Sequence, residues 1–267
     1  MAKDTQPKMT NEPTEVLGAV RIVLVNTTHP GNIGGVARAM KNMGLADLRL
    51  VNPQGYPSAE ATARASGAHD LLARARVHDD LDTALAGCCR VLGTSARQRT
   101  LRWPELPPRA AAADLLQAAS AGPVALLFGR ERTGLTNEEL DRCQALVTIP
   151  THPDYSSLNL AAAVQVLTYE LRLAALEAGP GTATTVASPV GGEVDAPHEE
   201  LERFYAHLEE TLQVLDFLDP DNPRHLMRRL RRLFARARPS VNEVNILRGI
   251  LSHAARGPVG RRGPERD

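Results

Sequence analysis

Aromatic residues are scarce in this chain: phenylalanine, tyrosine and tryptophan together make up 3% of its 267 residues. This scarcity argues against a surface that reads single-stranded nucleic acid by stacking its bases on aromatic rings. Only three cysteines occur, Cys88, Cys89 and Cys143, and they form no Cys-x-x-Cys pair. The sequence therefore indicates neither a zinc site nor a disulfide scaffold, and we expect a protein of the reducing cytoplasm.

Long apolar runs are also missing. No apolar stretch approaches the roughly 20 residues that span a bilayer, so we expect no membrane partner. Residues 1–15 lack the hydrophobic core of a signal peptide. The formal net charge is zero, from 31 basic and 31 acidic residues, so only local charge can indicate nucleic acid.

Several common catalytic signatures are absent as well. The first predicted strand is not followed by Gly-x-Gly-x-x-Gly, which disfavours an ordinary dinucleotide site or a Rossmann methyltransferase. The sequence also contains no Walker loop, no Gly-x-Ser-x-Gly elbow and no pair of histidines at metal-ligand spacing. We expect no metal site.

Apolar segments and helical segments alternate from residue 19 onward. Five apolar runs are predicted strands, at residues 19–25, 48–51, 89–96, 124–128 and 145–149. Nearly continuous apolar strands separated by helices are typical of a parallel sheet that is covered on both faces. We predict an α/β domain with a mostly parallel sheet over residues 18–176.

The rest of the chain divides into a second domain and three irregular segments. Residues 177–198 are rich in glycine, proline, threonine and serine and are predicted to be a flexible linker. Amphipathic helical patterns predict a small all-α domain over residues 199–255. Residues 1–17 and 256–267 are predicted to be disordered.

Four helix starts can be predicted from capping residues. Thr136–Glu139 and Ser240–Glu243 have the spacing of capping boxes. Asn222, just before a proline, is a plausible cap for the middle helix of the all-α domain. Ser156 or Ser157 is well placed to cap the helix that follows the fifth predicted strand.

The middle helix of the all-α domain is strongly basic. No acidic residue lies between Asn222 and Pro239, while the stretch contains Arg224, Arg228, Arg229, Arg231, Arg232, Arg236 and Arg238. Positive charge of this density repels itself without an anionic partner, which favours a phosphate-binding face over a solvated one. We predict that RNA is bound by Arg224, Arg228, Arg229, Arg231 and Arg232.

Three polar clusters follow predicted strands. Asn32 and Arg38 follow the first strand, Glu131 follows the fourth, and Ser157 and Asn159 follow the fifth. In an open α/β sheet, ligands bind at the carboxyl ends of the strands. We therefore expect these clusters to meet in one site.

Taken together, the clusters closely resemble the three motifs of the SpoU branch of the SPOUT methyltransferases. The segments are Asn26-Thr-x-His-Pro-Gly-Asn-Ile-Gly-x-x-Ala-Arg38, Phe128-Gly-x-Glu-x-x-Gly-Leu135 and Ile149-Pro-x-x-x-x-Tyr-x-Ser-Leu-Asn-Leu160. The resemblance covers residues 20–173. The first motif and the Asn-x-x-Asn-Ile-Leu-Arg-Gly-Ile stretch near the C-terminus are similar to the TrmJ group. That group methylates the ribose 2′-hydroxyl of cytidine or uridine at position thirty-two of the tRNA anticodon loop.

The resemblance implies a deep trefoil knot, here at about Thr94–Leu171, that holds S-adenosylmethionine in a bent pose. It also implies a homodimer that completes the active site, and no metal. Carried over by position, the cofactor pocket would comprise Thr94, Ser95, Ala96, Gly129, Ile149, Ser156, Ser157 and Leu158.

The family's reaction-centre positions fall on Asn32, Arg38, Glu131, Ser157 and Asn159. The ribose oxygen would attack the sulfonium methyl group, with Asn32 and Asn159 positioning the ribose and the loop backbone. Arg38 is the family's catalytic residue, but a guanidinium stays protonated at ordinary pH. We therefore expect Arg38 to stabilise the developing oxyanion or to hold a phosphate rather than to act as a base. Glu131 would orient either Arg38 or its own loop.

Three other readings remain open at this stage. The substrate could be another tRNA nucleotide or ribosomal RNA, with the same chemistry. The chain could instead be an RNA-binding protein without catalysis, or a scaffold whose basic helix pairs with an acidic protein. The sequence does not decide between cytidine and uridine, which tRNAs are accepted, or where the helical domain docks.

Overall fold

The computed structural model describes residues 14–96, 103–178 and 194–256. The predicted disorder at residues 1–13 and 257–267, and most of the predicted linker, lie outside these ranges. The strands are β1 Val20–Val25, β2 Asp47–Val51, β3 Arg76–His78, β4 Arg90–Thr94, β5 Glu105–Leu106, β6 Val124–Phe128 and β7 Ala145–Val147. The helices are α1 Thr14–Leu17, α2 Pro30–Met43, α3 Ala59–Ala65, α4 His69–Arg74, α5 Leu81–Leu85, α6 Pro108–Ala118, α7 Asn137–Leu140, α8 Leu160–Ala178, α9 His198–Val214, α10 Leu226–Ala237 and α11 Val241–Ala255.

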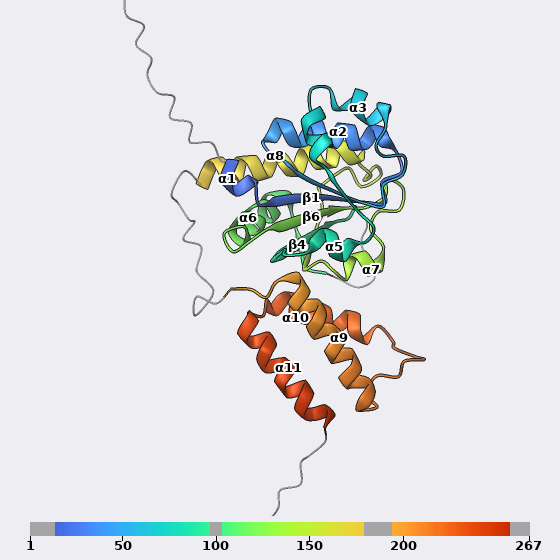
Figure 1. Cartoon of the computed structure of the whole chain (residues 1–267), viewed down its shortest axis with the longest axis vertical. Coiled ribbons are helices and arrows are strands. Elements are labelled where there is room, and N and C mark those ends of the chain that lie inside the picture. The colour runs from blue at the N-terminus through green and yellow to red at the C-terminus, as the bar shows by residue number, and fades with distance from the viewer. Residues whose placement is uncertain (1–13, 97–102, 179–193, 257–267) are drawn as a thin grey trace, which may run out of the picture.

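The strands form one parallel sheet in the order β3-β2-β1-β6-β4-β7-β5 (Figure 1). This confirms the predicted α/β fold, and all five predicted strands are present. The sequence analysis missed β3 and β5, which stand at the two edges. Each is too short for an apolar period to identify it, and β3 is exposed over most of its length.

Helices cover both faces of the sheet, which explains why the central strands are apolar throughout. On β1, Ile22 and Leu24 point into the core beneath α2, α3, α6 and α8. The alternate residues Val23 and Val25 point to the opposite face, where α5 and α7 pack. Successive side chains of a strand point to opposite faces, so a sheet that is covered twice needs apolar residues at every position.

The predicted capping boxes at Thr136–Glu139 and Ser240–Glu243 are both present. The other two helix-start predictions were wrong. Helix α8 is capped by Asn159, whose Oδ1 accepts the backbone N–H of Ala161 at 2.9 Å. Helix α10 begins after His225, a residue with left-handed backbone conformation and no side-chain cap.

Helix α1 corrects the predicted boundary of the disordered N-terminus. Residues 14–17 form a helical turn, and Leu17 is completely buried in the core of the α/β unit. A single leucine after a polar segment gives no periodic signal, so the sequence analysis extended the disordered segment four residues too far.

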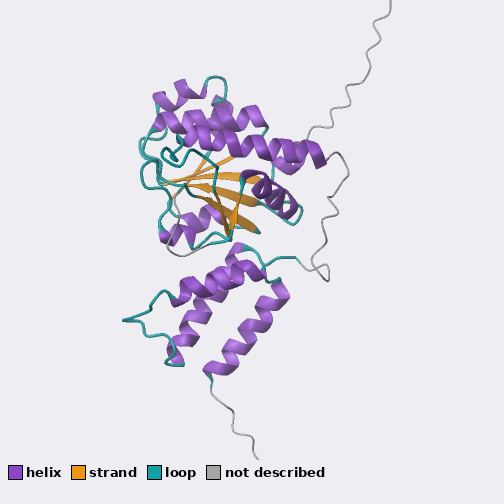
Figure 2. Cartoon of the chain, turned by 180° about the vertical axis from the view of Figure 1, so that it is seen from behind, coloured by secondary structure: helices purple, strands orange, loops and turns teal. Residues whose placement is uncertain are grey.

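Helices α9, α10 and α11 form a separate unit with its own apolar core around Phe204, Leu208 and Val244. Figures 1 and 2 show this unit beside the layer of the α/β unit that contains α5 and α7. Side-chain contacts join the two units: Arg228 of α10 forms an ion pair with Asp141 after α7, and the buried His198 of α9 lies within hydrogen-bond distance of Asp82 of α5, at 3.3 Å. The helical unit therefore docks on the α/β unit of its own chain.

No helix within the described ranges is long and apolar enough to cross a membrane.

Candidate functional site

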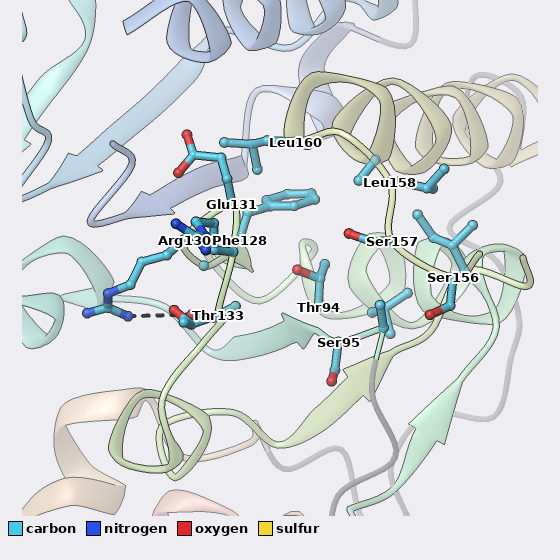
Figure 3. Close-up of a pocket in the computed structure, with 17 residues that line it drawn as sticks. Thr94, Ser95, Phe128, Arg130, Glu131, Thr133, Ser156, Ser157, Leu158 and Leu160 are labelled. Atoms are coloured by element: carbon cyan, nitrogen blue, oxygen red, sulfur yellow. Dashed lines mark hydrogen bonds between the residues drawn. The ribbon is translucent and has the colours of Figure 1, made fainter. Parts of the chain in front are cut away.

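A pocket lies at the carboxyl ends of β4, β6 and β7, three strands that are neighbours in the sheet (Figure 3). It contains all eight predicted cofactor residues: Thr94, Ser95, Ala96, Gly129, Ile149, Ser156, Ser157 and Leu158. It is also lined by Phe128, Arg130, Glu131, Arg132, Thr133, Gly134, Val147, Leu160 and Ala163. Three loops that are distant in the sequence thus meet where parallel strands end, which is the usual ligand position in such sheets.

The pocket wall combines small hydroxyl-bearing residues with apolar side chains. Thr94 is held in place because its Oγ1 donates to the carbonyl of Leu127 at 2.9 Å. Thr94, Ser95, Ser156 and Ser157 bring hydroxyl groups to the cavity. Such a lining offers apolar contact area together with a few fixed hydrogen-bonding groups, as small-molecule sites do.

Glu131 organises the neighbouring loops. Its carboxylate accepts four hydrogen bonds: from the backbone N–H groups of Thr28 and His29, from Thr28 Oγ1 at 2.8 Å, and from Asn32 Nδ2 at 2.9 Å. Three of the donors belong to the segment that connects β1 to α2, and the fourth, Asn32, lies in the first turn of α2. Of the two roles predicted for Glu131, the contacts support orienting a loop, since Glu131 binds the β1–α2 segment and not Arg38.

The network continues to helix α8. Asn32 Oδ1 accepts a hydrogen bond of 3.0 Å from Asn159 Nδ2, and Asn159 Oδ1 caps the helix. Glu131, Asn32 and Asn159 therefore connect the three polar clusters through side chains. Their closeness agrees with the expectation that the clusters meet at one edge of the sheet.

Glu131 is held in its ionised form. Partial burial would raise the pKa of this carboxyl, but the hydrogen bonds from Asn32 and Thr28 outweigh burial and lower it below the ordinary value. A carboxylate that accepts several hydrogen bonds stays charged at neutral pH, so Glu131 serves as a fixed anionic anchor.

The loop from Gly129 to Gly134 is held from a second side. Arg130 forms a two-pronged ion pair with Glu139 of α7, with both N···O distances at 3.0 Å. In Figure 3 the Glu131 carboxylate and the Arg130 guanidinium leave this loop in different directions. The loop closes so tightly that a Cβ on Gly129 would lie 2.2 Å from the backbone of Gly134, so position 129 requires glycine.

The predicted reaction-centre residues do not all lie in the pocket. Glu131 and Ser157 line it, and Asn32 and Asn159 join it through the hydrogen-bond network. Arg38 is exposed on α2, does not line the pocket, and forms no hydrogen bond or ion pair with any residue that the structure describes.

Two residues that anchor the loops of the site were missed by the sequence analysis. Thr28 occupies a variable position of the first motif, and Arg130 a variable position of the second. Thr28 acquires its role from Glu131, which is 103 residues away in the chain. Arg130 acquires its role from Glu139, nine residues away, through the folding of the loop between β6 and α7.

Four of the five predicted RNA-binding arginines separate into two groups. Arg228 binds Asp141, with Nε 2.9 Å from the carboxylate, and Arg231 binds Glu202 while lying over the Tyr205 ring. These two guanidinium groups are neutralised within the chain and are largely buried. Arg224 and Arg229 are exposed and have no partner among the described residues. The prediction assumed that the helix lacked an anionic partner, but the α/β unit and α9 supply several.

Across residues 14–96, 103–178 and 194–256, no three histidine, cysteine, aspartate or glutamate side chains lie close enough together to hold a metal ion.

Two family models match the chain. Residues 19–169 match the SpoU rRNA Methylase family, which covers more than half of the sequence. Residues 199–263 match the C-terminal domain of the tRNA methyltransferase TrmJ.

Curated relatives cover most of the chain. It is 58% identical over 243 residues to the tRNA (cytidine/uridine/adenosine-2′-O-)-methyltransferase TrmJ of Pseudomonas aeruginosa (strain UCBPP-PA14), which includes 89% of this chain and 94% of that protein. It is 52% identical over 240 residues to the tRNA (cytidine/uridine-2′-O-)-methyltransferase TrmJ of Klebsiella pneumoniae, with 89% and 96% covered.

Solved structures are similar as well. The crystal structure of TrmJ from Z. mobilis ZM4 superposes with a TM-score of 0.73 at 36% identity, over 87% of this chain and 97% of that one. A probable methylase family protein from Haemophilus influenzae Rd KW20 has a TM-score of 0.59 at 42% identity, over 90% and 97% of the chains.

Proposed function

The chain belongs to the SpoU methylase family, and we propose that it methylates the ribose 2′-hydroxyl of tRNA in the cytoplasm. Its preferred target would be cytidine or uridine at position thirty-two of the anticodon loop. The observation that carries this proposal is the pocket at the ends of β4, β6 and β7, which adjoins the Glu131–Asn32–Asn159 network. The named activities of the tRNA methyltransferases that share 52–58% of its residues support it.

The pocket residues fit S-adenosylmethionine. Ile149, Leu158 and Val147 offer apolar walls for an adenine ring, and the hydroxyls of Thr94, Ser95 and Ser157 offer hydrogen bonds to its polar groups. Arg130, one of the two arginines of this loop, is bound to Glu139, which offsets its charge beside the pocket. When bound, the cofactor supplies a methyl group that is already activated by the sulfonium charge.

The chain's own residues would align the ribose and stabilise the negative charge that develops on its 2′-oxygen. Asn32 and Asn159 are fixed by their shared hydrogen bond and by Glu131, so the loops around the ribose would need no rearrangement during the reaction. Arg38 would stabilise the negative charge that develops on the 2′-oxygen, or hold the neighbouring phosphate.

We further propose a homodimer in which Arg38 acts at the pocket of the partner. Arg38 is exposed outside its own pocket and has no partner among the described residues, and its helix packs against α8 through Gly35 and Ala161. The solvent side of α8 carries Val166, Tyr169 and Leu176, which are 36%, 49% and 51% exposed. An apolar stripe beside an unpaired arginine is the surface that a second copy would cover.

Tyr169→Arg tests the dimer. The charge would prevent the α8 stripes from packing, so sedimentation should show a monomer and methyl transfer should be lost, while cofactor binding to the intact pocket persists. A monomeric variant with full activity would refute completion of the site by a partner.

We also propose that residues 94–171 contain the trefoil knot. Strand β7 inserts between β4 and β5, two strands that precede it in the chain, and such a topology supports threading. A crystallographic backbone trace that left this segment unthreaded would refute the knot.

We also propose two domains, residues 18–176 and 199–255, each with its own apolar core. Limited proteolysis tests this division, because cleavage within residues 177–198 should release the two domains intact.

Methyl transfer to unfractionated tRNA tests the main proposal. Labelled S-adenosylmethionine would be incubated with tRNA, and the nucleosides separated afterwards, with Arg38→Ala as the control. We expect label in 2′-O-methylcytidine and 2′-O-methyluridine, and none in the control. Label in 2′-O-methyladenosine would extend the substrates to adenosine, the third nucleoside in the name of the Pseudomonas aeruginosa relative. No label in tRNA from a protein that still binds the cofactor would refute the tRNA assignment, and absence of cofactor binding would refute the methyltransferase.

A further inference from the structure

Helix α10 presents three faces with different surroundings. The first packs inside the helical unit through Met227, Leu230 and Phe234. The Phe234 ring lies edge-on to Phe204, with 4.8 Å between the ring centroids. This face fixes the rotation of the helix and therefore decides where each of its arginines points.

The second face is basic, but its charges are balanced within the chain. Arg228 binds Asp141, and Arg231 binds Glu202. Just after the helix, Arg238 binds Asp195 at 2.7 Å and also reaches Asp114 of α6. These three arginines hold the helical unit in place. Because carboxylates of the chain neutralise their charges, they attract an external anion only weakly.

The third face consists of Arg229, Arg232 and Arg236. Residues at i, i+3 and i+7 lie on one side of a helix, and these three span about 10 Å along its axis. Arg229 and Arg236 are exposed, and no carboxylate pairs with any of the three within the described residues. The Nε of Arg232 is buried without a hydrogen-bond partner.

The third face continues into a shallow hollow at the start of α10. Arg224 and Arg229 line it together with Phe217, whose side chain is 68% exposed. Asp219 is also present there, but its carboxylate accepts the backbone N–H of Asp221 at 2.9 Å. An exposed aromatic ring beside two unpaired guanidinium groups suits an unpaired base and its phosphates.

We propose that the outer face of α10, defined as Arg224, Arg229, Arg232 and Arg236, binds the backbone phosphates of the RNA substrate. An adjacent side of the same helix, through the contacts of Arg228 and Arg231 with Asp141, holds the helical unit on the α/β unit. This inference rests on the proposed function for its choice of RNA. A row of unpaired guanidinium groups suits a polyanion with regularly spaced charges, and the adjoining Phe217 favours RNA over an acidic protein.

Direct binding of tRNA to the double variant Arg229→Ala/Arg236→Ala tests the proposal. Its control is Arg74→Ala/Arg109→Ala, which removes the same charge from two exposed arginines of the α/β unit that pair with Asp70 and Glu177. Affinity would be measured by fluorescence anisotropy over a salt series. Because each lost phosphate contact removes counterion release, we expect the double variant to bind roughly tenfold or more weakly, with a salt slope smaller by about two.

The control should bind as the wild type does, and Arg229→Lys/Arg236→Lys should recover most of the affinity, since lysine also binds phosphate as a point charge. Both alanine variants should keep the melting temperature of the wild type, because none of these arginines supports the core. Unchanged affinity and salt slope in Arg229→Ala/Arg236→Ala would overturn the proposal, and this is the outcome if the face binds an acidic protein. Failure of the proposed function gives a different result: the wild type itself would transfer no methyl group to tRNA.

Discussion

The side-chain amide of Asn159 donates a hydrogen bond of 3.0 Å to the side-chain oxygen of Asn32, although 127 residues separate the two in the chain. Both ends of this pair are fixed by groups with a single hydrogen-bonding role. Asn159 Oδ1 faces the N–H of Ala161, which can only donate, and Asn32 Nδ2 faces the carboxylate of Glu131, which can only accept. Each asparagine must therefore be donor and acceptor at once, which aspartate cannot be when ionised.

Asn32→Asp should disrupt this network. The substitution places a carboxylate oxygen where an amide nitrogen now lies 2.9 Å from Glu131, so two negative charges face each other. We expect a large loss of turnover at neutral pH that partly recovers as the pH falls, because one proton can then be shared by the pair. Methyl transfer measured over a pH series checks this, with the exposed Asn245→Asp as a control. Wild-type turnover of Asn32→Asp at neutral pH would contradict it.

Thr28 should act as a positioning residue through its hydroxyl group. Thr28→Val keeps the shape of the side chain but removes the 2.8 Å hydrogen bond to Glu131, whereas Thr28→Ser keeps the hydroxyl. A hydrogen bond to a charged group at a partly exposed position contributes about 1 kcal/mol, so we expect kcat/KM to fall roughly fivefold in the valine variant. The serine variant should stay close to the wild type. Equal kinetics for valine and serine would show that the hydroxyl is dispensable.

Arg228→Ala should loosen the helical unit and also disturb the pocket. Asp141, the partner of Arg228, follows α7, and Glu139 of the same helix holds Arg130 of the pocket loop. Removal of Arg228 leaves Asp141 largely buried without its main cation, which destabilises by roughly 2–4 kcal/mol. We expect faster proteolysis between the units and weaker binding of S-adenosylmethionine.

The control for that variant is Arg229→Ala, the next residue of α10, which has no partner in the described structure. It should leave both proteolysis and cofactor affinity unchanged. If Arg228→Ala released the helical unit but bound the cofactor normally, α7 would not connect the docking surface to the pocket.

The contact between Asp82 and His198 should give the docked state a dependence on pH. The pKa of Asp82 lies well below its usual range because His198 and Arg142 hydrogen-bond to the carboxylate, although partial burial opposes them. A carboxyl with a lowered pKa stabilises the folded state fully above its unfolded pKa of about 3.9, and this contribution is lost as the pH falls through the folded value. The difference in unfolding free energy between wild type and Asp82→Asn should therefore be full above about pH 5 and shrink in more acidic buffer.

Urea unfolding of both proteins over a pH series measures this difference. A difference that stays constant or grows as the pH is lowered would mean that Asp82 is not the group responsible.

Two glycines in helices should respond to alanine in opposite ways. At Gly34 a Cβ would lie 2.1 Å from the carbonyl oxygen of Ala61, so Gly34→Ala must separate α2 from α3 and should destabilise by about 1–3 kcal/mol. At Gly249 nothing lies within 4 Å of the Cβ, and α11 gains a better helix former. Gly249→Ala should therefore stabilise by about 0.5–1 kcal/mol. Thermal or urea unfolding checks both, and a destabilised Gly249→Ala would reveal a contact missing from this description of α11.

Much of the architecture followed from local chemistry. The five central strands could be predicted because a sheet covered on both faces needs continuous apolar runs, as in Val20–Val25. The two capping boxes could be predicted because their reciprocal hydrogen bonds join residues only three positions apart. The edge strands β3 and β5 could not, since a few residues at an exposed edge carry no distinctive pattern.

The sequence by itself determined the α/β class, the basic character of α10 and the residues that would gather around the pocket, because motif and periodicity are properties of neighbouring residues. Only the tertiary structure decided which partners those residues meet. It assigned Glu131 to the β1–α2 segment, left Arg38 exposed, and turned Arg228 inward while Arg229 stayed in solvent. The physical reason is that a hydrogen bond or an ion pair depends on distances of about 3 Å between atoms, and contacts across a hundred residues are set by the packing of whole elements.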